Sequence, residues 1–478
     1  MKQKKASKKT ILITETARTK EIKRSKKPSI FILIPLFVIT IFVITTTIYK
    51  LVEFFSATPS KFPRIDISLL EVPIERINIE DKNIKYPGNT ITLTVNGETN
   101  IFENVEIKGR GNTTWKQPKR PYQFKLNNKT NLLNLNKAKK WILLANYLDR
   151  SHLRNNIAFY LEKMLDEPYS LSGNYVELYV DDYYLGLYFL TEKIEIDKYS
   201  INLQDPLGII VELDNIYGGS KDIHIRTSNN DYIALYDTVN EDLEEPAIKH
   251  FVTNFNNLES AVKEQDYSKI SSIIDVDSFA KYFLLSEFTI NPDAYSSSFF
   301  LYKDGEKDKI HAGPGWDFDI GFGNREWNNT EVDYSPFYSP FESTIIKDQI
   351  PTENTPVELT DYLKSISTII YDLLDIPEFS TRVREIYQST LSGKGDELLN
   401  YIRNQADYIR DAVYRDQARW KYDTDFNEEV DYLIDWVTKR YQHFEETYGP
   451  ESPNPNDNTE SVSIESINSI NSIENSEF

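Results

Sequence analysis

Residues 90–126 read TITLTVNGETNIFENVEIKGRGNTTWKQPKRPYQFKL, and this stretch sets the class of fold. Apolar and polar residues alternate in three of its segments, which predicts β-strands over Thr90–Val95, Asn104–Lys108 and Tyr122–Leu126. The pair Asn96-Gly97 is typical of a tight turn after the first strand. The turn Gly109 to Trp115 contains two glycines and precedes the third strand. We therefore expect a strand, a loop and a strand that presents a lysine.

Downstream of this stretch the pattern changes from strands to helices. Ser151–Leu165 has the apolar spacing of an amphipathic helix, with Asp149 or Ser151 as its cap. Further strands are predicted at Tyr175–Val180, Tyr184–Leu190 and Gly208–Asp214. Helical periodicity dominates after residue 240, over Asp242–Glu264, Asp277–Phe288, Val357–Leu374, Asp396–Arg415 and Glu428–Tyr448. The pattern predicts an α+β fold with a sheet-rich N-terminal lobe and a helical C-terminal lobe.

Composition and charge exclude several classes of function. The chain has 478 residues, 40% of them hydrophobic, which is enough for a sizeable core. It has no cysteine, so disulfides, thiolate nucleophiles and cysteine-ligated zinc are excluded. Residues 1–28 carry eleven Lys or Arg against two Glu, a net of +9, so the other 450 residues carry −29 of the total of −20. An acidic body of this kind argues against binding to nucleic acid.

The N-terminal segments predict a membrane anchor. Residues 30–49 read IFILIPLFVITIFVITTTIY without a charge, and at helical rise they span roughly 30 Å, the thickness of a hydrocarbon core. We interpret residues 29–50 as an uncleaved transmembrane signal anchor, because the apolar run is long for a cleaved signal peptide. The basic residues 1–28 then form a cytoplasmic tail, and the rest of this single-pass protein lies outside the cytoplasm. Residues 51–89, interrupted by prolines, are predicted to be a stalk.

The C-terminal segment, residues 449–478, has a different composition. It contains three prolines and then a repeat in which Ser recurs every third residue from Ser463 to Ser472. Its polarity and brevity predict a solvated, disordered tail. The alternative, more specific interpretation is that the serines of this tail accept phosphate.

Carboxylates between residues 287 and 324 carry the predicted chemistry. Asp293 follows an apolar helix, and Asp317 and Asp319 lie in the glycine-rich stretch HAGPGWDFDIGFG of residues 311–323. Phosphoryl transfer needs one carboxylate to orient the acceptor hydroxyl and another to hold a cation against the phosphates. Asp293 suits the first role and Asp317 the second. A turn or helix-ending residue is the structural alternative for Asp293, whereas Asp317 and Asp319 lie among aromatic residues, where unpaired carboxylates are costly.

Five ordered motifs resemble the CotH kinase family, the spore-coat protein H type of atypical protein kinase: residues 109–115 (GRGNTTW), 119–125 (KRPYQFK), 149–155 (DRSHLRN), 186–193 (GLYFLTEK) and 313–319 (GPGWDFD). The resemblance implies a bilobal, protein-kinase-like domain over residues 90–448. It also implies ATP with Mg²⁺ or Mn²⁺ as cofactors. The implied activity is phosphorylation of Ser or Thr in exported, cell-surface or spore-coat proteins, with the protein's own Ser-rich tail as one further substrate.

The resemblance also implies roles for the acidic residues and their neighbours. Asp293 matches the catalytic-loop aspartate, and Asp317 matches the metal-holding aspartate. Asp319 is then a second ligand or a support for the first. Protein kinases place an Asn five residues after the catalytic Asp as a further metal ligand, and Ser298 stands there in this chain. A serine hydroxyl is a neutral and weaker ligand, so a protein that keeps the fold without full activity is an alternative.

The phosphate-binding residues are predicted on the first strands. Lys125 is the first choice for the lysine that grips the phosphates, with Lys119 and Arg120 as alternatives. A solvated strand lysine is the structural alternative for each of them. Arg110 and Arg154 are expected to contact phosphate or to pair with acids. Glu162, on the helix after the lysine-bearing strand, is the predicted partner of the phosphate lysine.

Two other classes of function compete with a kinase. A surface adhesin or scaffold would keep the fold without catalysis. A metal-dependent hydrolase would use Asp293, Asp317 and Asp319 without a nucleotide. Binding of ATP with Mg²⁺ separates the three classes, because only a kinase needs both.

Overall fold

The computed structural model describes residues 62–70, 72–79, 81–324 and 366–450. The predicted transmembrane segment, the basic tail and the Ser-rich repeat lie outside these residues. Within the described part of the chain, no helix is both long enough and apolar enough to cross a membrane.

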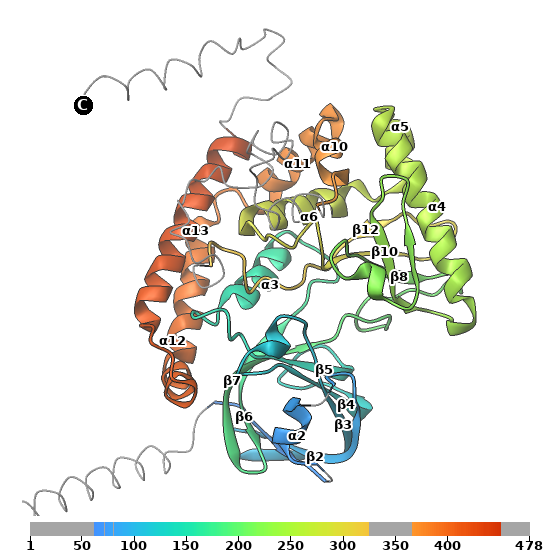
Figure 1. Cartoon of the computed structure of the whole chain (residues 1–478). Coiled ribbons are helices and arrows are strands. Elements are labelled where there is room, and N and C mark those ends of the chain that lie inside the picture. Colours follow the sequence, from blue (N-terminus) through green and yellow to red (C-terminus); the bar gives the residue numbers. More distant parts are fainter. Residues whose placement is uncertain (1–61, 71, 80, 325–365, 451–478) are drawn as a thin grey trace, which may run out of the picture. The chain divides into compact units, whose positions relative to one another are not determined.

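The first part of the described chain is a closed β-barrel (Figure 1). Its strands follow the order β1-β2-β3-β4-β5-β7-β6, and β1 closes it by pairing antiparallel to β2 and parallel to β6. The bounds are β1 Arg64–Ser68, β2 Tyr86–Val95, β3 Glu98–Gly109, β4 Tyr122–Thr130, β5 Ala138–Leu144, β6 Gly173–Val180 and β7 Tyr183–Glu192. The short helix α2, Ile74–Ile79, lies between β1 and β2 in sequence.

The predicted strands of this region are confirmed, and most are longer than predicted. Asn96 and Gly97 have φ of 51° and 86°, as a tight hairpin turn between β2 and β3 requires. Alternate side chains such as Ile107, Phe124 and Trp141 fill the barrel interior. The intervening side chains therefore face outward, because successive residues of a strand point to opposite faces.

Part of the segment predicted as a stalk belongs to the barrel. Residues 64–68 form β1, and β1 contributes Ile65 and Ile67 to the barrel interior. The prolines at 63 and 73 suggested a linker, but the first immediately precedes this short strand and the second immediately precedes α2. A strand of five residues bounded by prolines is easily mistaken for a linker, because only its pairing with distant strands identifies it.

The second part combines helices with another sheet. The sheet has the order β12-β11-β8-β10-β9, with bounds β8 Ile209–Leu213, β9 His224–Arg226, β10 Tyr232–Thr238, β11 Phe299–Lys303 and β12 His311–Ala312. The helices are α3 Arg154–Met164, α4 Glu244–Lys263, α5 Tyr267–Ile273, α6 Val276–Thr289, α10 Ile369–Leu374, α11 Pro377–Thr390, α12 Gly395–Trp420 and α13 Phe426–Tyr448. The mixed α+β class, with a sheet-rich first part and a helical second part, is confirmed. The second part contains more sheet than predicted.

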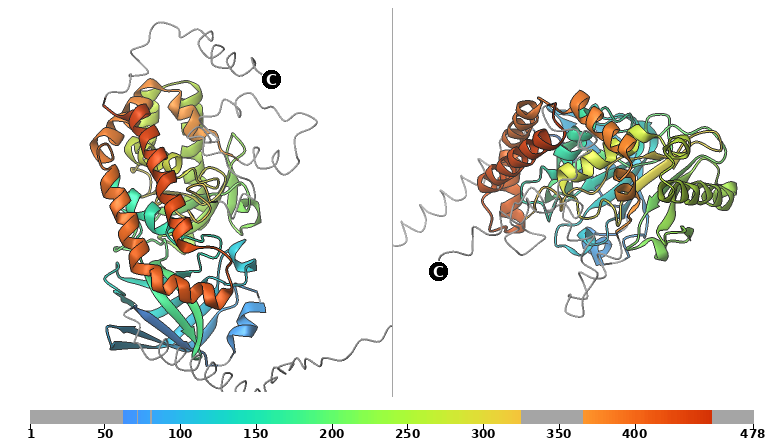
Figure 2. Two further views of the ribbon diagram at one scale, coloured as in Figure 1. Left: turned by 90° about the vertical axis from the view of Figure 1, so that its left-hand side faces the viewer. Right: turned by 90° about the horizontal axis from the view of Figure 1, so that it is seen from above.

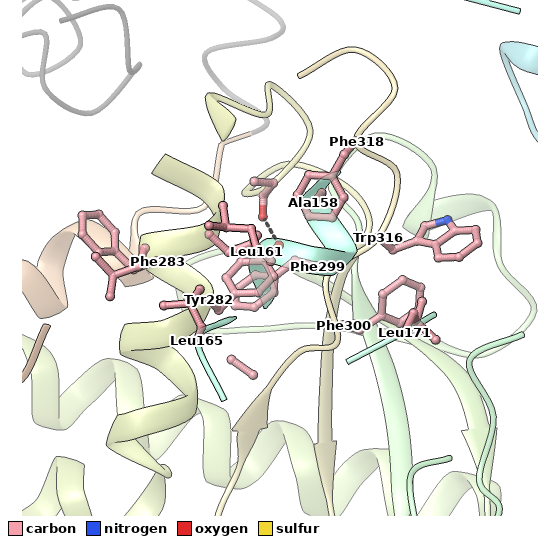
Figure 3. Packing of buried hydrophobic residues seen from close by; sticks show 14 of the residues in the cluster. Ala158, Leu161, Leu165, Leu171, Tyr282, Phe283, Phe299, Phe300, Trp316 and Phe318 are labelled. Carbon is pink, nitrogen blue, oxygen red and sulfur yellow. Dashed lines mark hydrogen bonds between the residues drawn. The ribbon is translucent and has the colours of Figure 1, made fainter. Parts of the chain in front are cut away.

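Helix α3 packs in the main core, which includes the aromatic residues that flank the predicted acids (Figure 3). Ala158 and Leu161 of α3 lie in the same buried cluster as Trp316 and Phe318. The ring of Tyr282 on α6 stacks on Phe299 of β11 with centroids 4.2 Å apart. These contacts fix α3, α6 and β11 against one another around residues 313–322.

Helix α12 packs along β7 of the barrel (Figure 2). Its buried Asp416 forms an ion pair with buried Lys119 at 2.6 Å. Asp416 also accepts a hydrogen bond from the backbone N–H of Leu187 at 2.7 Å. A side chain at Gly186 would place its Cβ 2.1 Å from Asp416 Oδ1, so only glycine allows this approach. The buried ion pair of Lys119 and Asp416 thus joins the barrel to helix α12.

Candidate functional site

Helix α3 holds the loop that carries the predicted metal ligands. Glu162 accepts a hydrogen bond from the backbone N–H of Gly315 at 2.6 Å. Asn155 accepts one from Phe318 N–H at 2.9 Å, and Arg154 Nε donates to the carbonyl of Gly321 at 3.0 Å. All three side chains are buried. One helix therefore fixes the backbone on both sides of Asp317 and Asp319.

Arg154 is itself held by an acid. Asp149 pairs with its guanidinium at 2.5 Å and accepts a hydrogen bond from its backbone N–H at 2.8 Å. Helix α3 begins at Arg154, three residues later than predicted, and Asp149 satisfies its first N–H group. Asp149 or Ser151 was the predicted cap, but the N-cap residue is Leu153, whose own side chain makes no capping hydrogen bond. Both predicted residues still accept hydrogen bonds at this end, Asp149 from Arg154 N–H and Ser151 Oγ from Leu153 N–H at 3.2 Å. Of the two roles expected for Arg154, the structure displays the pairing with an acid.

Asn291 joins the Asp293 segment to the Asp317 loop. Helix α6 ends in a left-handed residue, Ile290, with φ of 44°. Asn291 Oδ1 then accepts a hydrogen bond from Asp293 N–H at 3.2 Å, while its Nδ2 donates to the carbonyl of Asp317 at 3.2 Å. One buried amide therefore fixes both predicted acids relative to each other.

Two acids that the sequence reasoning missed are Glu212, on strand β8, and Asp214, which follows the last residue of β8, Leu213. Glu212 lies on β8 opposite Phe300 of the neighbouring strand β11, and the backbone of Ser298, just before β11, opposes the rise in the pKa of Glu212. Asp214 accepts hydrogen bonds from the N–H groups of Ile216 and Tyr217 at 3.2 and 2.8 Å. The alternation of residues 209–214 carried the only sequence signal for these acids.

Burial and mutual repulsion make these carboxylates hard to ionise. Burial, and then the charges of Asp317 and Asp214, raise the pKa of Asp293 to about 7. Burial raises the pKa of Asp317, and the charge of Arg110 opposes this. Burial and the neighbouring charge of Asp317 hold the pKa of Asp319 well above its usual value. Burial also raises the pKa of Glu212 to about 7. The charge of Lys221 opposes this rise, and the charges of Asp214 and Asp317 add to it.

Arg110 faces these acids from the end of β3. Its guanidinium carbon lies 4.9 Å from the centroid of the Trp316 ring. The charges of Asp317 and Glu212 act on it, although burial lowers its pKa. Its Nη1 atom is buried and has no hydrogen-bond partner among the described residues. A buried guanidinium N–H without a partner is costly and suits an anionic ligand.

The three residues predicted to supply the phosphate lysine, or to replace it, have other neighbours than the acids of this site. Lys125 is exposed on β4, where its strand neighbours are Glu106 and Lys140. Lys119, one alternative, is buried against Asp416. Arg120, the other, lies 4.8 Å from the ring centroid of Trp115 and donates to the carbonyl of Asn78.

Glu162 is placed differently from the prediction. It was expected to pair with a phosphate lysine, but its Oε1 holds the loop N–H of Gly315. Its Oε2 is buried without a hydrogen-bond partner among the described residues, and burial raises its pKa to about 7. Glu162 therefore positions the loop that carries Asp317.

The donor set fits a cation bound together with phosphate. In the described residues, no three acidic or histidine side chains converge as a complete metal-binding group. Mg²⁺ does not need such a group, since proteins usually hold it through one or two carboxylates plus phosphate oxygens. Asp317 supplies a carboxylate on which the charge of Arg110 acts, and the buried Nη1 of Arg110 has no hydrogen-bond partner among the described residues. Ser298 immediately precedes β11, the strand that pairs with strand β8, on which Glu212 lies.

This fold and site define an α+β protein in which several acids repel one another and two of them interact with an arginine, an arrangement typical of phosphate-binding proteins that use a cation. The family model for CotH kinase protein matches residues 107–444. The chain therefore belongs to the CotH kinase protein family, as the five motifs predicted. No curated protein matches the chain.

Proposed function

We propose that this protein is an atypical protein serine/threonine kinase that uses ATP with Mg²⁺ or Mn²⁺. Membership of the CotH kinase protein family supports a kinase-like activity. The observation that carries the proposal is that Asp317 interacts electrostatically with both Asp293 and Arg110, whose buried Nη1 has no hydrogen-bond partner among the described residues. Phosphoryl transfer needs these elements, namely a hydroxyl-orienting carboxylate, a cation-holding carboxylate and a phosphate-binding cation.

Each residue has a separate role in the proposed reaction. The oxygen of the acceptor hydroxyl forms a bond to the γ-phosphorus, and the bond between that phosphorus and the β–γ bridging oxygen breaks. Asp293 orients the hydroxyl and takes its proton, and ADP leaves with the electron pair of the broken bond. A divalent cation, when bound, neutralises charge on the phosphates. Asp317 would hold that cation, and Arg110 would hold a phosphate.

The ordinary pKa of an aspartic acid would make Asp293 a weak proton acceptor. Burial and two neighbouring carboxylates raise the pKa of Asp293 to about 7. A base is most effective when its pKa lies near the working pH. The same repulsion that makes the acid cluster costly in the free protein therefore favours proton acceptance by Asp293.

The barrel and the second part correspond, in this proposal, to the two lobes of a protein-kinase-like fold. Arg110 comes from the end of barrel strand β3, whereas Asp293 and Asp317 come from the second part. The phosphates would then be held by residues of both lobes, as in protein kinases. Residues 90–324 and 366–448 fall in the predicted domain, and the barrel extends it to Arg64.

We also propose that the protein is anchored by residues 29–50, with its basic tail in the cytoplasm and its domain outside. The support is the uncharged run of residues 30–49 and the basic residues that precede it. Its substrates would be exported, cell-surface or spore-coat proteins, including its own Ser-rich tail. Protease added to intact protoplasts should remove the domain and spare the tail. Protection of the whole chain would contradict this topology.

Phosphate transfer from ATP tests the activity directly. The full-length protein in detergent is incubated with γ-labelled ATP, Mg²⁺ or Mn²⁺, and cell-surface proteins. A kinase transfers label to Ser or Thr and needs both cofactors. A scaffold transfers none, and a hydrolase releases phosphate or cleaves substrates without nucleotide. Absence of transfer with both metals, together with absence of nucleotide binding, would contradict the proposal.

A further inference from the structure

A long run of residues without an acid crosses the barrel. Residues 107–148 contain ten Lys or Arg and no Asp or Glu, in a chain whose total charge is −20. The run covers the end of β3, all of β4 and all of β5, which are consecutive neighbours in the barrel (Figure 1). Of the ten, Lys119 is buried in its ion pair with Asp416. The other nine leave this part of the barrel with a strong excess of positive charge.

The strand register gathers several of these lysines on the outward side of the sheet. Lys125 on β4 lies opposite Lys140 on β5 and opposite Glu106 on β3. The sequence neighbours of both lysines fill the barrel interior, so the lysines themselves point outward. Lys108 is two residues from Glu106 on β3, and it therefore lies on the same side, diagonal to Lys125.

Lys193 extends this row past the end of β7. Its backbone N–H donates to the carbonyl of Lys140 at 3.1 Å, which continues the pairing of β5 with β7 by one residue. Its Nζ lies 4.1 Å from the ring centroid of Tyr236. We call Lys108, Lys125, Lys140 and Lys193 the basic face.

The basic face carries more charge than its own neighbours balance. Like charges directly opposite each other on paired strands are destabilising, and Lys125 and Lys140 are such a pair. Two acids offset part of the charge, since Glu195 pairs with Lys140 at 2.8 Å and Glu106 lies opposite Lys125. Four lysines against two acids leave an excess of positive charge, which suits an acidic partner.

Residues 451–478 of the same chain have the complementary charge. They contain six Asp or Glu and no Lys or Arg. The last residue that the structure describes is Pro450, just after α13. The 28 residues beyond it would span up to roughly 90 Å when extended. A compact domain of the length of residues 62–450 has a radius of gyration of roughly 21 Å, so this segment is long enough to reach the barrel.

The rest of the molecule repels an acidic segment. The residues after 28 carry −29 altogether, although residues 107–148 contribute +10 to that total. Repulsion elsewhere and attraction at the basic face therefore direct an acidic segment to the barrel.

We propose that residues 451–478 dock on the basic face of the barrel of the same molecule. The lysines hold the acidic side chains of this tail through exposed charge pairs. Because the tail is part of the chain, its effective concentration at the basic face is high, so weak contacts suffice. The docking gives Lys125 a role away from the phosphate site. Use of the docked serines as phosphate acceptors rests on the proposed kinase function, whereas the docking itself does not.

Distances between two spin labels test the docking in the full-length protein without nucleotide. The chain has no cysteine, so Asn128→Cys on β4 and Ser469→Cys in the tail provide two unique labelling sites. Double electron–electron resonance of this labelled parent in detergent should give one narrow distance at low salt. In about 1 M NaCl the distances should become broadly distributed, because the Debye length falls to roughly 3 Å.

Charge reversal identifies the surface that holds the tail. Lys125→Glu with Lys140→Glu should lower the ratio of docked to undocked tail on the order of 10-fold or more. Lys249→Glu with Lys269→Glu is the matched control, since these exposed, ion-paired lysines lie on α4 and α5. The control should keep the narrow distance. Lys125→Gln with Lys140→Gln replaces the reversal if that variant unfolds, and it should lower the ratio by a smaller factor.

Each other outcome overturns a part of the inference. Broadly distributed distances in the labelled parent at low salt would overturn the docking and leave the basic face to an anion of another molecule. A narrow distance that persists in Lys125→Glu with Lys140→Glu, or that is lost equally in the control, would overturn the role of the basic face. A narrow distance that disappears on dilution with unlabelled protein would assign the face to the tail of a second copy. The measurement needs no ATP, so failure of the proposed kinase function would leave its result unchanged.

Discussion

Two groups of buried charges in this molecule behave in opposite ways. In the first, Lys119 pairs with Asp416 and Arg154 pairs with Asp149, which we call the paired charges. In the second, which we call the acid cluster, the members Asp293, Asp317, Asp319, Glu212 and Asp214 repel one another. The charge of Arg110 acts on Asp317 and Glu212, and that of Arg154 acts on Asp319. Burial penalises both groups, but the neighbours differ in sign. Attraction opposes the effect of burial at Lys119 and Asp416, whereas repulsion adds to it at Asp293.

This difference separates residues that hold the fold from residues available for chemistry. Removing one partner of a buried ion pair leaves an uncompensated charge, so the paired charges are expected to matter for stability. A cluster of like charges costs stability and has strongly shifted pKa values, which is typical of functional sites. Loss of charge in the acid cluster should therefore reduce function without unfolding the protein. Both statements can be tested on neighbouring parts of the same chain.

The largest expected effect on function comes from Asp317→Asn. The change keeps the shape of the side chain and removes the charge that would offset a divalent cation. Phosphate transfer should fall on the order of 10²-fold or more, and nucleotide binding should lose its dependence on Mg²⁺. Its midpoint of urea unfolding should stay the same or rise, because one repulsive charge is removed. Unchanged transfer would move the cation-holding role away from Asp317.

The largest expected effect on stability comes from Lys119→Met. The variant leaves the buried Asp416 without its ion-pair partner, which should lower the free energy of unfolding by about 3–5 kcal/mol. Urea unfolding measures the loss. The double variant Lys119→Met with Asp416→Leu should recover part of it, but Leu187 N–H then loses its acceptor. A loss below about 1 kcal/mol in the single variant would show that the pair does not hold α12 on the barrel.

An intermediate effect on ATP binding is expected from Arg110→Ala, and Lys125→Ala is its counterpart on the barrel. Arg110→Ala should weaken ATP binding about 10- to 100-fold, since charge-assisted hydrogen bonds contribute about 1.5–3 kcal/mol. Lys125→Ala should leave ATP affinity and stability nearly unchanged, because the side chain is exposed beside Glu106 and Lys140. Titration with a fluorescent ATP analogue measures both. The reverse result would restore Lys125 as the phosphate lysine.

The smallest predicted effect is a dependence of stability on pH at Glu167. Burial, with the charge of Glu162 added, raises the pKa of Glu167 from 4.5 to about 8. The folded state thus binds a proton more tightly than the unfolded state, so stability is highest below pH 4.5 and decreases as pH rises toward 8. Glu167→Gln removes this loss and should raise the free energy of unfolding at pH 8.5 by roughly 1 kcal/mol or more, with little change at pH 4.5.

Urea unfolding at the two pH values checks the Glu167 prediction. Glu245→Gln is the control, because Glu245 is exposed and pairs with the exposed Lys249. It should show no stabilisation at pH 8.5. An equal gain at both pH values in Glu167→Gln would assign the effect to packing rather than to the carboxyl charge.

Local sequence patterns predicted strands, turns and candidate acids better than they predicted which residues lie next to one another in the folded protein. The hairpin at Asn96-Gly97 and the acids at Asp293 and Asp317 were predictable, because turn chemistry and side-chain type are local properties. Glu212 was missed because its position in the sheet depends on the pairing of β8 with β11, which are far apart in sequence. The neighbours of Lys125 were not predictable either, because they depend on the pairing of β4 with β3 and β5. Phe124 and Leu126 lie in the barrel interior, so Lys125 between them points away from it.

The effect of Asp293→Asn on nucleotide binding and on transfer, measured with one preparation, tests the account most directly. Asp293 would act on the acceptor hydroxyl in the transition state, whereas Asp317 and Arg110 would hold the cation and the phosphates. The account predicts nearly unchanged affinity for ATP with Mg²⁺, an unchanged unfolding midpoint, and transfer reduced on the order of 10²-fold or more. Unchanged transfer, or a loss of transfer that merely follows a loss of ATP affinity or of folding, would contradict it.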